Sequence, residues 1–223
     1  AKLWDDHLIS SQDVARILTI AMDEKWPLPE SWIGEIDHQS SQIGKHCPEV
    51  FRPLLRHEGA TIRVLAATRL YNHQAPEEYV PSVLPLLKDT DDGVRAMAVQ
   101  FISNHRRYIK ELIPLCKDES GAVRAVAVRA INWACAGEFA GEALRCLDDP
   151  VAGVRSEAVQ ALHQLHEIKH ADKIVEHLKD EDPKTRINVA AMVIGLKITK
   201  HMDLAAKLLE DPEAQVRERV AHL

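Results

Sequence analysis

The chain has 223 residues, of which 46% are apolar and 28% charged, and its formal net charge at pH 7 is −6. This balance is typical of an ordered globular protein and excludes a disordered chain. The longest uncharged apolar run, residues 189–196, is too short to cross a membrane, so no membrane partner is predicted. The four cysteines include no Cys-x-x-Cys pair, which favours reduced structural thiols and a cytoplasmic location.

Residues 1–40 precede the repeats and are predicted to form an N-terminal helical cap. They hold eight acidic and three basic side chains, which gives this segment a net charge of −5. The apolar stripe of one predicted helix is Val14, Ile17, Leu18 and Ala21. Three of the four tryptophans lie in the same segment, at Trp4, Trp26 and Trp32. We expect the segment to cover the open end of the first repeat, because solenoid ends need covering. The alternative is an aromatic binding patch.

Residues 41–223 are predicted to form six helical repeats, because one pattern recurs through them. Its marker is an arginine that returns after 29 to 32 residues, at Arg63, Arg95, Arg124, Arg155, Arg186 and Arg217. In the last five copies an aspartate precedes the arginine by six residues, at Asp89, Asp118, Asp149, Asp180 and Asp211. The approximate repeat bounds are 42–73, 76–106, 107–136, 138–168, 169–198 and 200–223. Self-similarity at this period is typical of a stacked-repeat solenoid.

Each repeat is predicted to contain two antiparallel helices joined by a turn rich in Asp, Gly and Pro. Acidic residues and proline suit the start of the second helix, where backbone N–H groups are free. On a helical wheel the recurring arginine falls inside the apolar arc, as Arg95 does between Val94 and Val99. A cation there needs a partner, and we predict that the aspartate six residues earlier supplies it. This structural interpretation is preferred to a phosphate clamp or a catalytic acid.

The pattern resembles the short repeat of the HEAT-repeat family found in bacterial and archaeal proteins. Pro53, Pro85 and Pro114 each lie ten residues before the arginine of their repeat, where HEAT repeats often carry a proline. The last three repeats have Arg145, Glu176 and Lys207 at this position. The resemblance implies an all-α fold, a right-handed α-solenoid of about six repeats whose second helices line the concave side. It does not fix an activity, because one fold serves many functions.

HEAT-like enzymes are one alternative to a binding function. The iron-binding His-Glu pairs of deoxyhypusine hydroxylases occur at equivalent repeat positions, whereas His57-Glu58 and His166-Glu167 do not. Bilin lyases of phycobiliproteins share the short repeat, and HEAT-like alkylpurine DNA glycosylases use a concave helical surface. A glycosylase would need a basic cleft, but subtracting the −5 of the first segment leaves only −1 for residues 41–223. This near-neutral charge also argues against nucleic acid as a partner.

Three histidines around the junction of the fourth and fifth predicted repeats are spaced like metal ligands. His163, His166 and His170 are separated by three and four residues, and His177 follows them. Three imidazoles could hold zinc or nickel if they converged, but a helix break is expected within residues 167–171. We interpret these histidines as polar surface or as partners of helix C-termini, so no metal or other cofactor is predicted.

The positions two, five and nine residues after each arginine lie opposite the apolar arc and are predicted to form a concave binding face. The candidate partner-binding residues are Met97, Gln100, Asn104, Val126, Arg129, Trp133, Gln160 and Gln164. Interface cores are enriched in Met, Arg and aromatic residues, and Trp133 is a candidate hot spot. The other interpretation is that Trp133 packs under the next repeat. We predict a non-enzymatic scaffold for a protein or peptide; the alternatives are a HEAT-like enzyme and a purely structural or engineered array.

The last repeat stops within its second helix, and no polar capping repeat follows it. Val216, Val220 and Leu223 are therefore expected to face no neighbour within the chain. Two arrangements would cover them, a native chain that continues or a homodimer formed through this C-terminal repeat.

Overall fold

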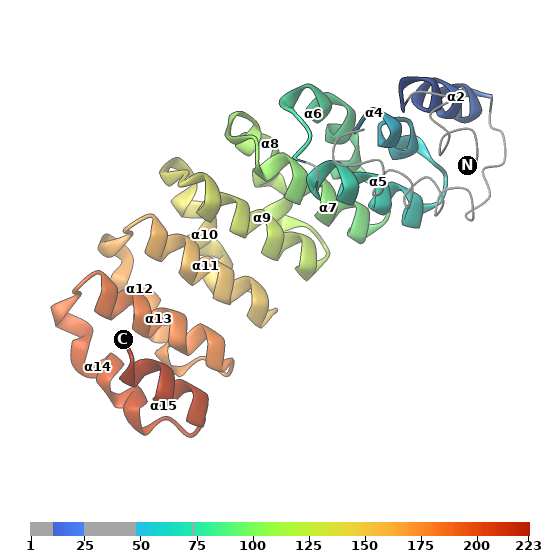
Figure 1. Ribbon diagram of the computed structural model, residues 1–223. Coiled ribbons are helices and arrows are strands. Elements are labelled where there is room, and N and C mark those ends of the chain that lie inside the picture. The colour runs from blue at the N-terminus through green and yellow to red at the C-terminus, as the bar shows by residue number, and fades with distance from the viewer. Residues whose placement is uncertain (1–10, 25–47, 73) are drawn as a thin grey trace. The chain divides into compact units, whose positions relative to one another are not determined.

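The computed structural model describes residues 11–24, 48–72 and 74–223. These residues form helices joined by turns and include no β-strand, which confirms the predicted all-α class. No helix in these ranges is long and apolar enough to cross a membrane. The helices are arranged as pairs that repeat along the chain (Figure 1), as the period of the sequence predicts.

The helices alternate in length along the chain. The α-helices are α2 (Ser11–Asp23), α4 (Pro48–Phe51), α5 (Ala60–Asn72), α6 (Val80–Val83), α7 (Asp92–Ser103), α8 (Ile109–Leu112), α9 (Gly121–Ala134), α10 (Ala140–Arg145), α11 (Ala152–Gln164), α12 (Ala171–Ile174), α13 (Pro183–Gly195), α14 (Met202–Ala206) and α15 (Ala214–Ala221). Short 3-10 helices lie at Pro53–Arg56, Glu77–Tyr79, Leu84–Lys88, Arg106–Tyr108, Ile113–Lys117, Gly137–Phe139, Cys146–Asp148, Ile168–His170, Val175–Lys179, Thr199–His201 and Lys207–Glu210. Helices α5, α7, α9, α11, α13 and α15 are the second helices of the repeats, and each contains the recurring arginine.

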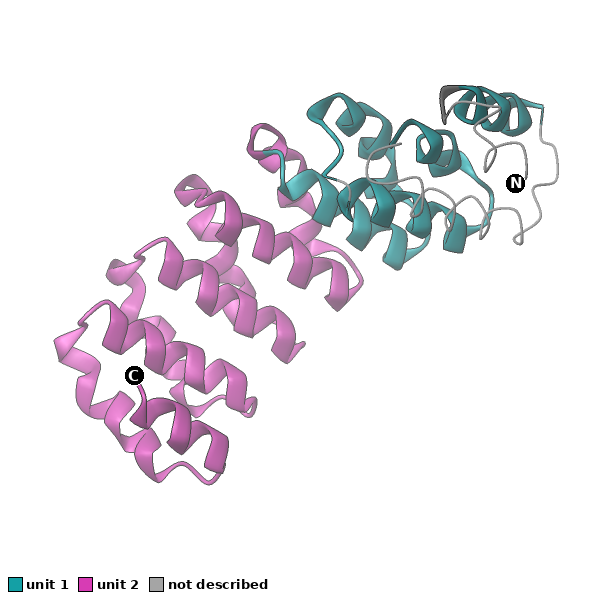
Figure 2. Ribbon diagram, in the orientation of Figure 1, with its two compact units in different colours: residues 1–105 teal, residues 106–223 magenta. Residues whose placement is uncertain are grey.

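Two compact units divide the chain, unit 1 at residues 1–105 and unit 2 at residues 106–223 (Figure 2). Unit 1 contains α2 to α7, and unit 2 contains α8 to α15. The boundary predicted after residue 40 falls outside the described residues and stays a prediction. Trp4, Trp26 and Trp32 also lie outside the described residues.

In unit 1, helix α2 packs against α4 and against the 3-10 helix Pro53–Arg56. Val14, Leu18 and Ala21 are buried, as their helical spacing predicts, whereas Ile17 is 52% exposed. The predicted stripe is therefore wrong at Ile17. This side chain lies at the edge of the stripe, where the 100° step of a helix turns it away from the buried face.

In unit 2, the second helices α9, α11, α13 and α15 lie side by side, each packed against the next (Figure 1). The apolar arc around the arginine forms the core, as the sequence predicts. On α11 the fully buried members of this arc are Val154, Ala158, Val159 and Leu162. The equivalent buried residues are Val123, Ala127, Val128 and Ile131 on α9, and Thr185, Val189, Ala190 and Val193 on α13. Because each stripe is covered by neighbouring helices, every repeat depends on the next one for its burial.

The first helix of each repeat is broken into an α-helical turn and a 3-10 turn. Helix α6 leads directly into the 3-10 helix Leu84–Lys88, which contains Pro85 near its start. Proline suits this position because it has no backbone N–H to donate. The last three repeats make the same break without proline, at Cys146–Asp148, Val175–Lys179 and Lys207–Glu210. Proline therefore favours the break but is not required for it.

Several second helices end in a residue with a left-handed backbone. These residues are Gln74, Cys135, His166 and Lys197, with φ between 47° and 53°. After α13, the N–H of Ile198 donates to the carbonyl oxygen of Val193 at 2.9 Å, which closes a Schellman cap. The cap satisfies carbonyl groups that the end of a helix leaves without partners. The sequence did not signal it, because none of the four left-handed residues is glycine.

The C-terminal repeat is better covered than the sequence predicts. Val216 and Val220 are buried, because α15 packs against α13 and against the 3-10 helix Lys207–Glu210. The expectation that both face no neighbour is wrong. Leu223, by contrast, is 45% exposed, and the homodimer through this repeat stays a prediction.

Candidate protein-binding surface

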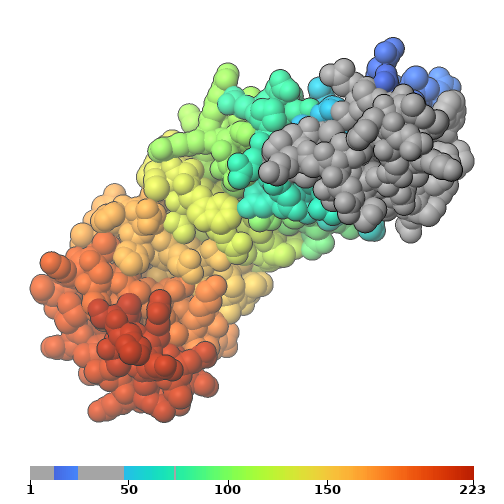
Figure 3. Space-filling model, viewed as in Figure 1, coloured from blue at the N-terminus to red at the C-terminus, as the bar shows by residue number. Residues whose placement is uncertain are grey.

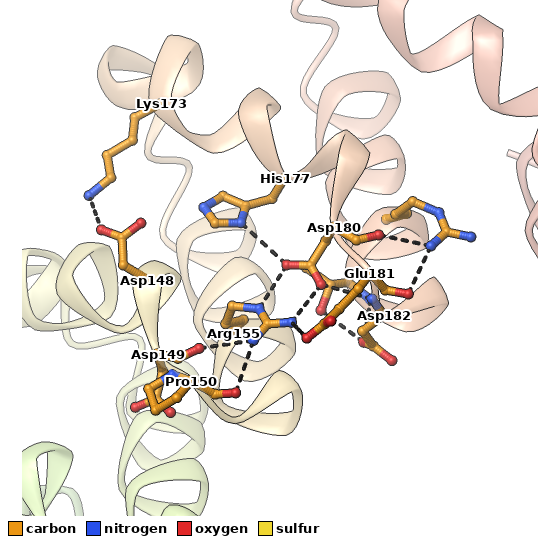
Figure 4. Close-up of polar contacts among 11 residues, drawn as sticks. Asp148, Asp149, Pro150, Arg155, Lys173, His177, Asp180, Glu181 and Asp182 are labelled. Carbon is orange, nitrogen blue, oxygen red and sulfur yellow. Dashed lines mark hydrogen bonds and ion pairs between the residues drawn. The ribbon is translucent and has the colours of Figure 1, made fainter.

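A row of arginine–aspartate pairs, here called the ladder, joins successive repeats. Arg155 donates from Nε to Oδ2 of Asp180 at 2.8 Å and from Nη2 to Oδ1 at 2.7 Å (Figure 4). Its Nη1 donates to the carbonyl oxygen of Asp149 at 2.9 Å. The same arrangement joins Arg63 to Asp89 in unit 1, and Arg124 to Asp149 and Arg186 to Asp211 in unit 2.

The aspartate of each of these pairs belongs to the following repeat, which corrects the prediction of a pair within one repeat. Asp149 precedes Arg155 by six residues, but its carboxylate accepts from Arg124 and from the N–H of Val151. Arg155 contacts Asp149 only through the backbone carbonyl oxygen of that residue, whereas its carboxylate partner is Asp180. The bond to Val151 holds the carboxylate of Asp149 in its own turn, directed at the preceding repeat. Spacing could not reveal this, because the same spacing recurs in every repeat.

Burial and hydrogen bonding act in opposite directions on the ladder carboxylates. Burial of Asp149 disfavours its charged form, but hydrogen bonds from Arg124 and from the N–H of Val151 outweigh this effect and lower its pKa. At Asp211 the hydrogen bond from Arg186 is the largest influence, and the pKa is again lowered. These carboxylates stay ionised at neutral pH and link the repeats, which agrees with the structural interpretation of the motif.

Trp133 lies near the end of α9 and is 51% exposed. About half of its surface is therefore accessible to a partner. One helical turn earlier, Nη2 of Arg129 donates to Oε1 of Glu157 on α11 at 2.8 Å. The Glu157 side chain is buried, whereas that of Arg129 is partly exposed. A buried carboxylate thus fixes a cation on the same face of α9 as an exposed indole.

Two glutamines extend this face onto α11. Gln164 is exposed, and its Nε2 lies 3.7 Å from Sγ of Cys135. Gln160 is half-buried one turn before it, and Val126 is half-buried on α9. We call the following set the Trp133 surface: Val126, Arg129, Trp133, Glu157, Gln160 and Gln164.

Glu157 is a member of this surface that the sequence analysis did not select. It lies two residues after Arg155, at one of the positions predicted to face the partner. The signal that could have found it is its opposite charge to Arg129, which lies at such a position in the preceding repeat. Because both positions lie on the predicted concave face of adjacent repeats, an arginine and a glutamate there favour an ion pair.

The other predicted binding residues lie in unit 1. Met97 and Gln100 are half-buried on α7, and Asn104 is exposed just after the last turn of this helix. An open, mainly polar hollow is lined by Tyr71, Asn72, Gln74, Ala75, Asn104 and His105. Burial lowers the pKa of His105 in this hollow, which favours its neutral form.

The spaced histidines each have a different environment. Nδ1 of His170 lies 3.0 Å from Oε1 of Glu167, and Nδ1 of His177 lies 3.4 Å from Oδ2 of Asp180. Burial lowers the pKa of His163. Across the part of the chain that the structure describes, no three His, Cys, Asp or Glu side chains are grouped to hold a metal ion.

Two buried cysteines from adjacent repeats are in contact. Sγ of Cys146 lies 3.9 Å from the carbonyl oxygen of Cys116, and both are free thiols. A hydrogen bond between the two side chains raises the pKa of Cys116, so this thiol stays protonated at neutral pH. Cys135 is exposed, and Cys47 lies outside the described residues. The contact crosses a repeat junction, but the two cysteines do not hold equivalent positions, because Cys116 lies eight residues before Arg124 and Cys146 nine before Arg155.

Neither a protein-family model nor a curated protein sequence matches this chain. Solved structures of helical repeat proteins do match. One is the complex of CpcE and CpcF of phycocyanin lyase from Nostoc, with a TM-score of 0.65 and 16% identity over 79% of this chain and 75% of the matched chain. A designed armadillo repeat protein in complex with a peptide, (KR)4, has a TM-score of 0.53 and 17% identity over 78% of this chain and 96% of its own. A computationally designed armadillo repeat protein for modular peptide recognition has a TM-score of 0.52 and 19% identity over 78% and 96%.

These likenesses establish the fold of the chain. It has the helical repeat fold of HEAT- and armadillo-like proteins, which confirms the resemblance drawn from the spacing of its arginines. The identities are low, so the likenesses carry no residue assignments. The function must be argued from the surface of this chain itself.

Proposed function

We propose that the protein is a scaffold that binds a protein or peptide segment on the Trp133 surface. The observation that carries this proposal is Trp133 itself, which is half exposed beside a cation held in place by a buried carboxylate. Tryptophan and arginine are enriched among the residues that dominate binding energies at interfaces. An exposed indole offers a large apolar area that a partner can cover at a small cost in side-chain entropy.

The polar groups of the Trp133 surface suit a polypeptide. The Arg129–Glu157 pair already neutralises most of the local charge, so the surface does not select strongly for an acidic or a basic partner. The amides of Gln160 and Gln164 both donate and accept hydrogen bonds, as backbone peptide groups require. Two of the similar structures are designed armadillo proteins described by their peptide recognition, which is in keeping with a peptide-binding use of this fold.

The test is capture of a partner from the source lysate, followed by a measured affinity. The immobilised chain is compared with its Trp133→Ala variant, and captured proteins are identified by mass spectrometry. For the partner retained by the native chain alone, calorimetry should show that the variant loses about 2 kcal/mol of binding free energy, which is a roughly 30-fold increase in Kd. Circular dichroism should show unchanged helical content, because Trp133 is not part of the core.

A matched control separates the surface from general loss of apolar area. Ile168 in the 3-10 helix Ile168–His170 is 49% exposed, close to the value for Trp133. Ile168→Ala should leave the affinity for the same partner unchanged. The proposal fails if both variants bind as the native chain does, or if Ile168→Ala weakens binding as much as Trp133→Ala.

A lyase-related function is the second candidate, because one of the similar structures is a complex of phycocyanin lyase subunits. A chain that handles a bilin pigment should hold it in solution. Mixing the protein with a free bilin should then give a shifted visible absorption band that co-elutes with the protein. An unshifted spectrum with free pigment in the late fractions would leave the scaffold as the surviving proposal.

A further inference from the structure

Within the described part of the chain, the ladder arginine of the last repeat has no partner on one side of its guanidinium. Nη1 of Arg217 donates to the carbonyl oxygens of Asp211 at 2.6 Å and Pro212 at 3.0 Å. Arg155 and Arg186 bind the equivalent two carbonyl oxygens of their own turns. In those arginines the Nε and Nη2 side then takes an aspartate of the next repeat, but no described residue occupies this side of Arg217.

Two apolar side chains of the last repeat are exposed, although the apolar residues at the equivalent positions of earlier repeats are buried. Leu209 is 49% exposed, and it lies eight residues before the ladder arginine. The residues at this position in the other repeats are all buried: Leu55, Leu87, Cys116, Leu147 and Leu178. Leu223 is 45% exposed and lies six residues after the arginine. The residues at this position in the four preceding repeats are all buried: Phe101, Ala130, Ala161 and Met192.

We propose that this outer face of the last repeat, formed by Leu209, Arg217 and Leu223, is a docking site for a further helical repeat whose inter-helix turn carries an aspartate. The expected contact already occurs within the chain, where four ladder arginines each bind such an aspartate through Nε and Nη2. Arg217 already holds the conformation that receives it. The last residues of the chain, dark red in Figure 3, lie at the surface of unit 2, where such a repeat has access.

A second copy of this chain does not supply the required turn at its first repeat. That repeat carries His57-Glu58 in place of the aspartate, and Arg63 of the same repeat binds the backbone carbonyls of both residues. The 3-10 helix before this turn, Pro53–Arg56, is already covered by α2. A partner repeat with an aspartate turn therefore fits the face, whereas the first repeat of another copy does not.

The docking site can be tested with a repeat built from the chain itself. The period of 31 residues places Leu223 at the position of Met192, so a copy of residues 193–223 appended after Leu223 continues the pattern in register. In the extended protein, the aspartate copied from Asp211 should bind Arg217. We expect the Tm to rise by at least about 3 °C, because the added repeat buries Leu209 and Leu223. Hydrogen exchange at the backbone amides around Arg217 should slow at least tenfold.

The matched control changes only the copied aspartate to asparagine. Asparagine keeps one side-chain oxygen that can accept the N–H bond of the turn. It carries no charge and has no second oxygen, so it cannot accept both guanidinium donors of Arg217 as a carboxylate does. Most of the gain in Tm and in exchange protection should be lost in this variant. Equal behaviour of the aspartate and asparagine versions would overturn the proposal, as would an appended repeat that gives neither gain.

The unmodified chain provides a second, independent measurement. Sedimentation equilibrium should show a monomer, because the proposed occupant is a different repeat and not a second copy. A dimer that dissociates when Leu209 is changed to Lys would show that the face is self-complementary, and it would replace the proposed partner. A dimer unaffected by Leu209→Lys and abolished by Trp133→Ala would instead place self-association on the Trp133 surface and contradict the scaffold function proposed above.

Discussion

At the scale of single residues, the guanidinium group of a ladder arginine determines how two repeats meet. Its Nη1 is bound by carbonyls of its own turn, so Arg155 cannot swing freely to find its aspartate. The two remaining donors bind both oxygens of Asp180 in a fork. Apolar stripes alone would tolerate sliding of one repeat on another. A buried, two-pronged pair disfavours sliding, because a shifted register would leave the charges unpaired.

The first prediction concerns this pair across the repeat junction. Replacing Asp180 by Ala strands a largely buried arginine and should lower the free energy of unfolding by about 3 kcal/mol in urea melts. In a double-mutant cycle, Arg155→Ala and Asp180→Ala should couple by more than about 1 kcal/mol. The partner assignment is tested by the same cycle with Asp149 in place of Asp180. A stronger coupling of Arg155 to Asp149 than to Asp180 would contradict the structure.

The second prediction is the acid dependence of stability. The pKa values of Asp89, Asp149, Asp180 and Asp211 are all lowered in the folded chain. The unfolded chain therefore binds more protons at low pH, and stability falls as the pH falls. The contribution is fully present well above the ordinary aspartate value of 3.8 and is lost as the pH drops past it through the lowered values. Urea melts from pH 7 to pH 2 should show this decline, with a shallower slope for Asp180→Asn. A stability that is flat below pH 4 would contradict the prediction.

At the scale of secondary structure, the ends of the second helices place non-glycine residues in a left-handed conformation. Lys197 has φ of 53°, which costs an L-residue roughly 1 kcal/mol compared with glycine. The Schellman bonds of the cap outweigh this cost, since they satisfy the last carbonyls of α13. The strain is a property of the repeat, because Cys135 and His166 lie at the equivalent position of their repeats.

The third prediction is that relieving this strain stabilises the protein. Lys197→Gly should raise the free energy of unfolding by about 0.5–1 kcal/mol, because glycine adopts the left-handed region without a steric cost. Lys184→Gly is the matched control, since it makes the same exchange at an exposed position in the first turn of α13. That substitution should destabilise by up to about 1 kcal/mol. The cap geometry would be in doubt if both substitutions lowered the unfolding midpoint alike.

The sequence predicts the helices that recur in every repeat, but it does not predict the local features at the helix ends. The apolar arc around each arginine identifies the second helices and their buried residues, such as Val154 and Val159, because burial imposes a helical period. The Schellman caps and the 3-10 turns without proline leave no composition signal. They arise from hydrogen bonds that close once the helices are packed, so Lys197 looks like an ordinary surface lysine in the sequence.

At the scale of the whole molecule, the repeat period predicts which residues are exposed, but it does not predict which residues of neighbouring repeats pair with each other. Positions nine residues after the arginine are exposed, as predicted, at Asn104, Trp133 and Gln164. The ion pair of Arg129 with Glu157 and the ladder bonds link different repeats. A single sequence gives the spacing within a repeat, but the offset between repeats is set by packing. The contacts across repeat junctions therefore had to come from the structure.

The last prediction is that the protein does not bind double-stranded DNA. The recurring arginines are the first candidates for phosphate ligands. Four of them are, however, bound to carboxylates in the ladder: Arg63, Arg124, Arg155 and Arg186. The whole chain carries a net charge of −6, which disfavours its approach to a polyanionic duplex. Fluorescence anisotropy with a labelled duplex at physiological salt should show a Kd weaker than about 10⁻⁴ M. Lowering the salt should not restore binding, because the net charge of −6 repels the duplex and four of the recurring arginines are held by carboxylates. Saturable binding that weakens steeply with added salt would show instead that the protein presents a basic surface, and it would restore the DNA-directed enzymes of this fold as candidates.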